Sequence, residues 1–330
     1  MNALVSLVVV LVLAALALAG GSLDGTRTLF GVLLPYAALA VFLAGFAYRV
    51  VKWALSPVPF RITTTSGQQK SLPWIKHQWL DNPFTATGTV LRMALEVLLF
   101  RSLFRNTKAE LRQGPQLVYG ENKWLWAAAL AFHWSFLIIL LRHLRFFFEP
   151  VPSFVNLIAY ADGFFQVATP VLYATDVAIL AALAYLLFRR FQESQVRYIS
   201  LFSDYFALYL LLGLAASGVL MRYFFREDVV AVKQLALGIV TLHPQVPKEV
   251  GALVFVHLFL LSVLVAYFPF SKLMHSGGVF LSPTRNLANN NRAIRHVNPW
   301  NYPVKTHTYA EWEEEFHDKI KAAGLPLEKE

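Results

Sequence analysis

Four histidines lie within or at the end of long apolar segments, and they are the residues best placed to do chemistry. His133 and His143 lie in one apolar run, and His257 and His275 lie in, or at the end of, a later one. An ionisable side chain is costly in lipid, so its presence in such a run indicates a function. Two helices that each offer two imidazoles can hold two iron atoms. The histidines therefore predict a di-haem electron carrier.

The spacing of the histidines predicts how they pair. His133 and His143 are ten residues apart, about 15 Å along a helix, and His257 and His275 are eighteen apart, five turns or about 27 Å. If the first helix runs outward and the second inward, His133 should pair with His275 near the cytoplasm, and His143 with His257 near the outer face, with each pair clamping one haem iron. The ten-residue spacing leaves His143 roughly 80° from the azimuth of His133, so the haems should diverge sideways.

Each of the other polar residues near these segments has more than one possible role. Arg142 and Arg222 could bind haem propionates, because a guanidinium matches a carboxylate, but they could equally be snorkelling interface residues. Asp176, expected mid-way along a span, could orient an imidazole, relay protons or be a hydrogen-bonded structural acid. The outer haem, beside Arg142 and Asp162, is the expected place for a quinone. The histidines themselves could be polar core residues or zinc ligands, although each pair supplies only two of the four ligands of a structural zinc site.

Hydropathy predicts an all-α, polytopic membrane protein. The 330-residue chain is 57% hydrophobic and 15% charged, and several of its apolar runs approach the ~20 residues that a membrane-spanning helix needs. The runs are continuous rather than alternating, which argues against a β-barrel. Six spans are expected, at about 3–19, 29–52, 123–147, 165–188, 204–224 and 250–273.

The distribution of basic residues predicts the orientation. Segment 52–123 carries ten Lys/Arg and four Asp/Glu, whereas segment 149–169 has no basic residue. Basic loops stay in the cytoplasm, so both termini should be cytoplasmic in a multi-pass protein of the bacterial inner membrane. The basic residues of 225–249 do not fit this pattern. Segment 87–104 is apolar with a polar stripe and should form a helix in the cytoplasmic interface.

The chain divides into four parts. Residues 1–53 should form two membrane helices, 54–122 a cytoplasmic loop, 123–275 a four-helix di-haem core and 276–330 a cytoplasmic tail for partner docking. Thr308 followed by Glu311 is a capping-box pattern, which predicts a helix over about 309–323. The rest of the tail, at 282–307, is expected to be ordered only against a partner.

The absence of cysteine excludes several kinds of redox chemistry. The chain contains no cysteine, so it can hold neither a thiolate-ligated iron–sulfur cluster nor a thioether-attached haem. Electrons must then pass through a non-covalent cofactor. The net charge of +9 lies beside membrane spans and reflects topology, not nucleic-acid binding.

The histidine spacings resemble those of NarI, the haem b membrane subunit of respiratory nitrate reductases. The local sequences resemble the DsrM family more closely, which comprises the membrane cytochromes b of the DsrMKJOP complex of dissimilatory sulfur metabolism. The similarity covers essentially the whole chain, and the extra first span departs from NarI and agrees with DsrM. It rests on segments 60–62, 67–74, 98–106, 131–136, 256–258, 268–275 and 283–291.

This resemblance implies two haems b, ligated by His133, His143, His257 and His275, and exchange with the menaquinone or ubiquinone pool. It also implies a cytoplasmic iron–sulfur partner like DsrK, a periplasmic multihaem cytochrome c like DsrJ, and subunits like DsrO and DsrP. No quinone-site residue is implied.

The sequence is therefore interpreted as a di-haem cytochrome b, the electron-transfer subunit of a quinone-linked oxidoreductase complex. One alternative is a proton or ion transporter with an intramembrane His/Asp relay. Another is a subunit that only anchors soluble partners at the membrane.

Overall fold

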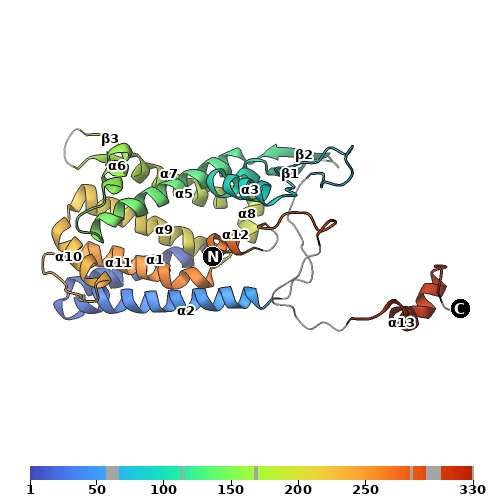
Figure 1. Cartoon of the computed structure of the whole chain (residues 1–330). Coiled ribbons are helices and arrows are strands. Elements are labelled where there is room, and N and C mark those ends of the chain that lie inside the picture. The colour runs from blue at the N-terminus through green and yellow to red at the C-terminus, as the bar shows by residue number, and fades with distance from the viewer. Residues whose placement is uncertain are drawn as a thin grey trace.

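The computed structural model describes residues 1–56, 67–112, 114, 116–166, 170–282, 285–294 and 306–328. The expected motif at 60–62 and positions 283–284 lie outside these ranges. Within them the protein is a mostly helical bundle whose long helices lie side by side (Figure 1). These helices are α1 (Asn2–Ser22), α2 (Leu34–Ala54), α5 (Lys123–His143), α7 (Ala174–Gln192), α9 (Phe202–Val219) and α11 (Ala252–Tyr267).

Short turns of π- or 3-10 helix extend four of the long helices, and one of them, η5 (Phe268–Phe270), follows α11. The turn η2 (Leu29–Leu33) precedes α2, η3 (Leu144–Phe146) follows α5, and η4 (Leu220–Phe225) follows α9. With these extensions, five helices of the described chain are long and apolar enough to cross a membrane. They cover Asn2–Ser22, Asp24–Ala54, Lys123–Phe146, Phe202–Phe225 and Ala252–Phe270. The chain is a multi-pass membrane protein, and its expected number of six spans is not confirmed.

The expected fourth span differs from the structure. A short hairpin of β3 (Gly163–Phe165) and β4 (Leu172–Tyr173) occupies the first part of 165–188, so α7 begins only at Ala174. Asp176 therefore lies in the first turn of α7, and its predicted place mid-way along a span is wrong. A carboxylate in a first turn complements the positive end of the helix dipole.

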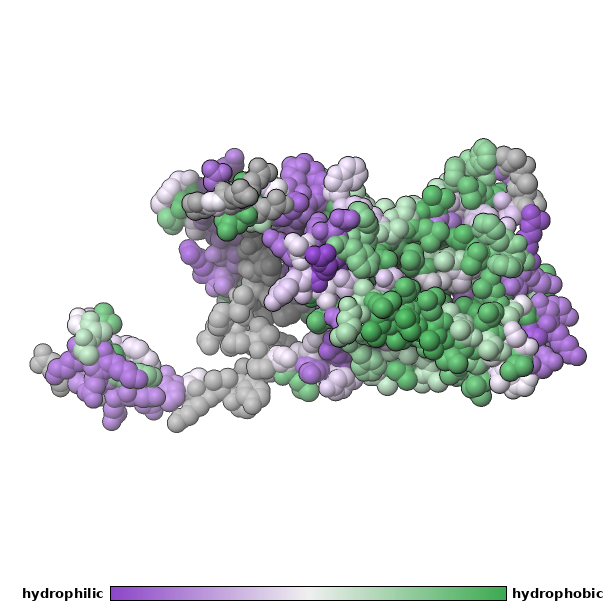
Figure 2. Space-filling view, turned by 180° about the vertical axis from the view of Figure 1, so that it is seen from behind, coloured by the Kyte–Doolittle hydropathy of each residue, from purple (hydrophilic) through white to green (hydrophobic). Residues whose placement is uncertain are grey.

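The helices pack around a core shared by α1, α7, α9 and α11. Its buried members include Ala17, Leu183, Leu210 and Leu260. Close crossings depend on small residues: a Cβ at Gly21 would lie 2.7 Å from Phe255. Small residues let membrane helices approach in this way, where lipid provides no hydrophobic driving force. The outer surface of the bundle is apolar and its ends are polar, as Figure 2 shows on one face.

The two ends of the bundle carry different secondary elements. Figure 1 draws α6 (Ser153–Asp162) and α10 (Val229–Val240) at one end. The opposite end carries α3 (Ala86–Leu99), α4 (Arg101–Phe104), α8 (Ser194–Ile199), α12 (His275–Leu281) and a hairpin of β1 (Thr107–Arg112) and β2 (Gln116–Glu121). The sequence analysis did not anticipate this hairpin.

The helix expected over 87–104 is present but broken. Phe100 adopts a left-handed conformation (φ 51°) between α3 and α4. Two indoles of α5 hold the end of α3: Trp126 Nε1 donates to the Leu99 carbonyl at 2.7 Å, and Trp134 Nε1 to the Leu98 carbonyl at 3.0 Å. These bonds satisfy carbonyls that the end of a helix leaves without partners.

Part of the tail packs on the rest of the chain. Asn289 Nδ2 donates to Asn82 Oδ1 at 2.6 Å, and its backbone N–H donates to the Pro83 carbonyl at 2.7 Å. Gln69 Nε2 donates to Asn289 Oδ1 at 3.0 Å. Residues 285–294 thus contact the loop of their own chain through side-chain amides, and the expectation that 282–307 is ordered only against a partner stays a prediction.

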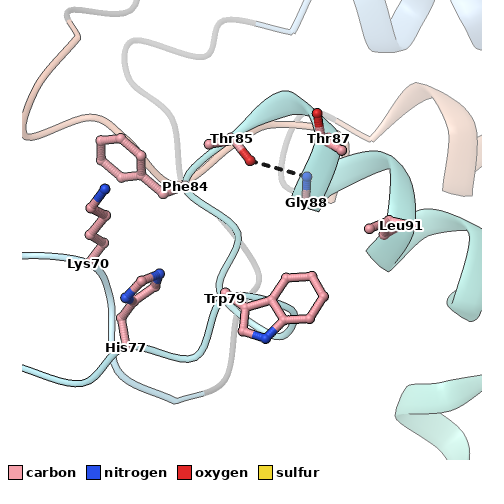
Figure 3. A pocket seen from close by; sticks show the side chains of 8 residues that line it. All are labelled: Lys70, His77, Trp79, Phe84, Thr85, Thr87, Gly88 and Leu91. Carbon is pink, nitrogen blue, oxygen red and sulfur yellow. Dashed lines mark hydrogen bonds between the residues drawn. The ribbon is translucent and has the colours of Figure 1, made fainter.

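The loop that receives this tail segment also encloses a pocket of about 220 Å³ (Figure 3). Its lining includes Lys70, His77 and Trp79, and Thr85 caps α3 by accepting from the Gly88 N–H at 3.2 Å. None of the four paired histidines lines it.

The predicted C-terminal helix is confirmed as α13 (Tyr309–Ala322). Thr308 Oγ1 accepts from the Glu311 N–H at 3.3 Å, and the Glu311 carboxylate accepts from the Thr308 N–H at 2.8 Å. This reciprocal pair is the capping box that the sequence pattern predicts.

Candidate cofactor site formed by two histidine pairs

Antiparallel packing brings the four histidines together in two pairs. The ring centres of His133 and His275 are 6.0 Å apart, with the ring planes at 81°. Those of His143 and His257 are 6.3 Å apart, with the planes at 6°. The predicted pairing is confirmed. Their role as metal ligands stays a prediction.

The second histidine segment is not one straight helix. The helix α11 ends at Tyr267, and two 3-10 turns, Phe268–Phe270 and Lys272–Met274, precede His275. Pro269 ends the regular helix because it has no N–H to donate. The prediction that five continuous turns separate His257 from His275 is therefore wrong, and the pairing depends on the bend.

One nitrogen of each imidazole is already engaged. Three histidines hydrogen-bond through Nδ1 to a backbone carbonyl, which can only accept. The Nδ1 atoms of these histidines therefore carry the protons, and their Nε2 atoms keep a lone pair. The bonds run from His133 to Ala129 (2.8 Å), from His143 to Ile139 (2.7 Å) and from His275 to Lys272 (2.8 Å).

The fourth imidazole is oriented by a side chain on another helix. His257 Nδ1 lies 2.9 Å from Ser217 Oγ of α9. The same hydroxyl donates to the Leu214 carbonyl at 2.9 Å. Because its single proton is used there, Ser217 accepts from the Nδ1–H of His257. All four histidines thus share one tautomer, with Nε2 available.

The separation of the rings in each pair is that expected of two imidazoles that would hold one metal ion between them. A metal–imidazole nitrogen distance of about 2 Å, and a nitrogen roughly 1.1 Å from its ring centre, put the centres of two axial imidazoles about 6 Å apart. The measured separations are 6.0 and 6.3 Å. An engaged Nδ1–H is also the usual outer-shell feature of a metal-ligating histidine. Among the described residues, no group of three or more His, Asp or Glu side chains could hold a metal ion, so a closed zinc site is not supported.

The surroundings of the two pairs differ. His133 and His275 are exposed, and the Phe100 and Phe132 rings meet His133 edge-on, with centres 4.9 and 5.0 Å away. His143 and His257 are half-buried within the bundle. A Cβ at Gly218 would touch the His257 ring at 3.4 Å, so a larger side chain at this position of α9 would press on the imidazole.

Arg142, expected at a propionate, has other partners in the structure. Its guanidinium is buried, with NH2 2.6 Å from Asp176 Oδ1 and Nε 3.1 Å from Asp162 Oδ2, the latter too poorly aligned for a hydrogen bond. It also lies 3.7 Å from the centre of the Tyr173 ring. Arg142 and Asp162, expected to serve a quinone, therefore lie at ion-pair distance from each other.

Asp176 and Arg222 lie in the same region. The second oxygen of Asp176 accepts from the Tyr223 hydroxyl at 2.8 Å, and no imidazole of the described chain hydrogen-bonds to this carboxylate. Arg222 donates to the Val171 carbonyl at 3.0 Å and lies 4.2 Å from the centre of the Tyr173 ring. Within the described ranges no carboxylate lies at ion-pair distance from Arg222, and its role as a propionate partner stays a prediction. The sequence analysis missed Ser217 and Tyr223, because no local pattern links them to histidines or acids 40 and 47 residues away.

Comparisons with known proteins agree with this geometry. Residues 92–296 match the family described as nitrate reductase gamma subunit. A protein of Archaeoglobus fulgidus, named Hdr-like menaquinol oxidoreductase cytochrome b-like subunit, is 48% identical over 279 residues, which are 82% of this chain and 83% of that protein. A protein of the same name from Archaeoglobus profundus is 44% identical over 274 residues, 81% of each chain. The matched family segment contains both histidine pairs.

Proposed function

Because the chain belongs to the nitrate reductase gamma subunit family, we propose that it is the di-haem cytochrome b subunit of a membrane-bound menaquinol oxidoreductase complex. This proposal rests on the two histidine pairs. In each pair the Nδ1 atoms are hydrogen-bonded, and the ring centres are 6.0 or 6.3 Å apart. Two haems b would each be held by one pair. When bound, they would supply one-electron transfer across the membrane.

The protein's own residues hold and orient these groups. Hydrogen bonding at Nδ1 fixes each ring and raises the basicity of Nε2. Ser217 performs this for His257, and backbone carbonyls do so for the other three. Arg222 would face a propionate, since it is a guanidinium without a carboxylate partner among the described residues.

A quinone site on the outer side belongs to the same proposal. The names of the Archaeoglobus relatives support menaquinol as the substrate, over ubiquinol. Of the polar groups near the outer histidine pair, Arg142 and Asp162 are paired with each other. Arg145, two residues after His143, and Arg222 are then basic groups near this pair that could bind a quinone oxygen, Arg222 as an alternative to binding a propionate.

We further infer that α7 is a sixth span and that both termini are cytoplasmic. Its 19 residues are about 28 Å long, close to the thickness of the hydrocarbon core. Its basic residues Arg189 and Arg190 lie in its last turn, on the side of the basic loop 67–112. This orientation gives two cytoplasmic regions, 54–122 and 276–330, for docking a DsrK-like iron–sulfur subunit. The proposed complex also contains DsrJ-, DsrO- and DsrP-like subunits. It lies in the inner membrane and acts in dissimilatory sulfur metabolism.

Haem content tests this function. The purified full-length chain should contain two non-covalent haems b per polypeptide, both low-spin with two imidazole ligands, measured by absorption spectroscopy of the pyridine complex against protein concentration. A well-folded preparation with one haem or none would refute the di-haem assignment. Proton or ion flux through haem-free protein in vesicles would instead support the transporter alternative.

A further inference from the structure

A cluster of four charged side chains, three of them buried, joins several elements at the outer end of the bundle. Arg142 lies at the end of α5, Asp162 at the end of α6, Asp176 in the first turn of α7 and Arg222 in η4 (Figure 1). The side chains of Arg142 and Asp162 are only 8% and 4% exposed, and that of Asp176 is 12% exposed. The formal charges of the two arginines and two aspartates balance, and Arg142 is the one that lies at ion-pair distance from both aspartates.

Thr175 and the tyrosines complete the cluster. The Thr175 hydroxyl and N–H donate to the two oxygens of Asp162, at 2.6 and 3.0 Å. The Tyr173 ring lies between the two guanidiniums, 3.7 Å from Arg142 and 4.2 Å from Arg222. Every acceptor oxygen of the two aspartates thus has a partner, and the end of α5 is tied to α6, α7 and η4.

The cluster begins one residue before His143. Arg142 and His143 share the last turn of α5, so whatever fixes the Arg142 backbone also fixes that of His143. The His143 ring lies parallel to that of His257, at 6°. The inner pair has charged neighbours too, but only a smaller group beside His275, where Lys272 pairs with Asp204 at 2.7 Å. Its ring planes are nearly perpendicular, at 81°.

We propose that Arg142, Asp162 and Asp176 form a positioning network that holds the two outer imidazole planes parallel. The inference rests on the proposed function, because it gives the outer histidines a cofactor to orient. The network itself touches neither imidazole. It acts by fixing the last turn of α5 against three other elements, while Ser217 fixes the facing ring.

Ring orientation can be read directly from a ferric low-spin haem. Parallel imidazole planes separate the energies of the two iron d orbitals that overlap with the ring π systems, whereas perpendicular planes leave them nearly equal. The two cases give different electron paramagnetic resonance spectra, with a larger g anisotropy for the perpendicular pair. The oxidised protein should therefore show two distinct low-spin signals, with the less anisotropic one from the outer pair.

The test compares graded variants of the full-length chain. Arg142→Met removes the central charge, and Arg142→Lys keeps it without the fork that reaches both carboxylates. Tyr223→Phe removes a hydroxyl that donates to Asp176 at 2.8 Å and accepts from the Tyr173 N–H at 3.1 Å. Because it leaves all four charges in place, this variant should fold even if the charge variants do not. Asp24→Asn is the matched control, because Asp24 is exposed.

We expect the outer signal to shift toward larger anisotropy in Arg142→Met, with a smaller shift in Arg142→Lys and in Tyr223→Phe. The inner signal and the two haems per polypeptide should be retained, and Asp24→Asn should be unchanged. An outer signal that is unchanged in all three cluster variants would overturn the positioning role while leaving the proposed function intact. Absence of two low-spin signals in the unmodified protein would instead overturn the proposed function.

Discussion

Replacing Ser217 by alanine isolates one orienting hydrogen bond of the outer pair. The hydroxyl accepts from His257 Nδ1 at 2.9 Å and donates to the Leu214 carbonyl, so alanine removes the acceptor without adding volume. The Leu214 carbonyl stays within the helical hydrogen-bonding pattern of α9. The change therefore acts mainly on the tautomer and orientation of the His257 ring.

The size of the effect follows from what the imidazole loses. An N–H left with no acceptor costs about 1–3 kcal/mol, and this is an upper bound here because the Leu214 carbonyl also hydrogen-bonds to His257. Loss of an outer-shell partner typically weakens metal binding about 10- to 100-fold, or roughly 1.4–2.7 kcal/mol. The hydrogen-bond estimate and the metal-binding estimate overlap, so we expect the outer haem to bind about 10- to 100-fold more weakly in Ser217→Ala.

The affinity for the outer haem can be measured by the transfer of haem to a scavenging apoprotein. The absorption spectra of the two haems show which of them is transferred. Ser262→Ala is the matched control: Ser262 is also buried, and its hydroxyl donates to the Leu258 carbonyl at 2.7 Å within α11. Unchanged outer-haem affinity in Ser217→Ala, or equal weakening of both haems, would refute the reasoning.

Three further predictions follow from the pairing and from the cytoplasmic contacts. Replacing His143 or His257 by alanine should remove the same haem and leave the other spectrum intact, as measured by haem content and absorption; loss of different haems would contradict the pairing. Asn289→Ala should leave the buried amide of Asn82 without its partner and loosen the loop by about 1–3 kcal/mol, seen as faster hydrogen exchange in 67–83 with no change in the bundle helices. Deleting 306–330 should release the iron–sulfur subunit on co-purification and retain both haems; full retention of that subunit would show that α13 is not the docking element.

The identity of the chemical groups could be inferred from the sequence because helix geometry is periodic. An apolar run longer than about 20 residues must become a helix in lipid, which fixes the place of His133, His143 and His257 along their helices. The basic loops set the direction of each helix, and opposite directions predicted the two pairs. Capping by Thr308 and Glu311 was equally readable, since all its contacts lie within four residues.

Helix boundaries that depend on non-local contacts could not be predicted from the sequence. The start of α7 was expected nine residues too early, because the β3–β4 pairing that delays it joins segments whose sequence is as apolar as a membrane helix. The break before His275 has a local signal in Pro269, but its geometry depends on two successive turns.

The sequence alone thus predicted that three imidazoles lie in membrane helices, that His275 lies in or at the end of an apolar run, and which of the four face one another. Only the tertiary structure decided what holds them: the hydroxyl of Ser217, 40 residues from His257, and the carboxylates of Asp162 and Asp176, 20 and 34 residues from Arg142. An arginine beside a predicted haem can pair with a propionate or with a protein carboxylate equally well by charge. Which of the two Arg142 binds depends on whether the packing of α6 and α7 brings an aspartate within about 3 Å of its guanidinium. The packing of the whole bundle sets the distance between these side chains.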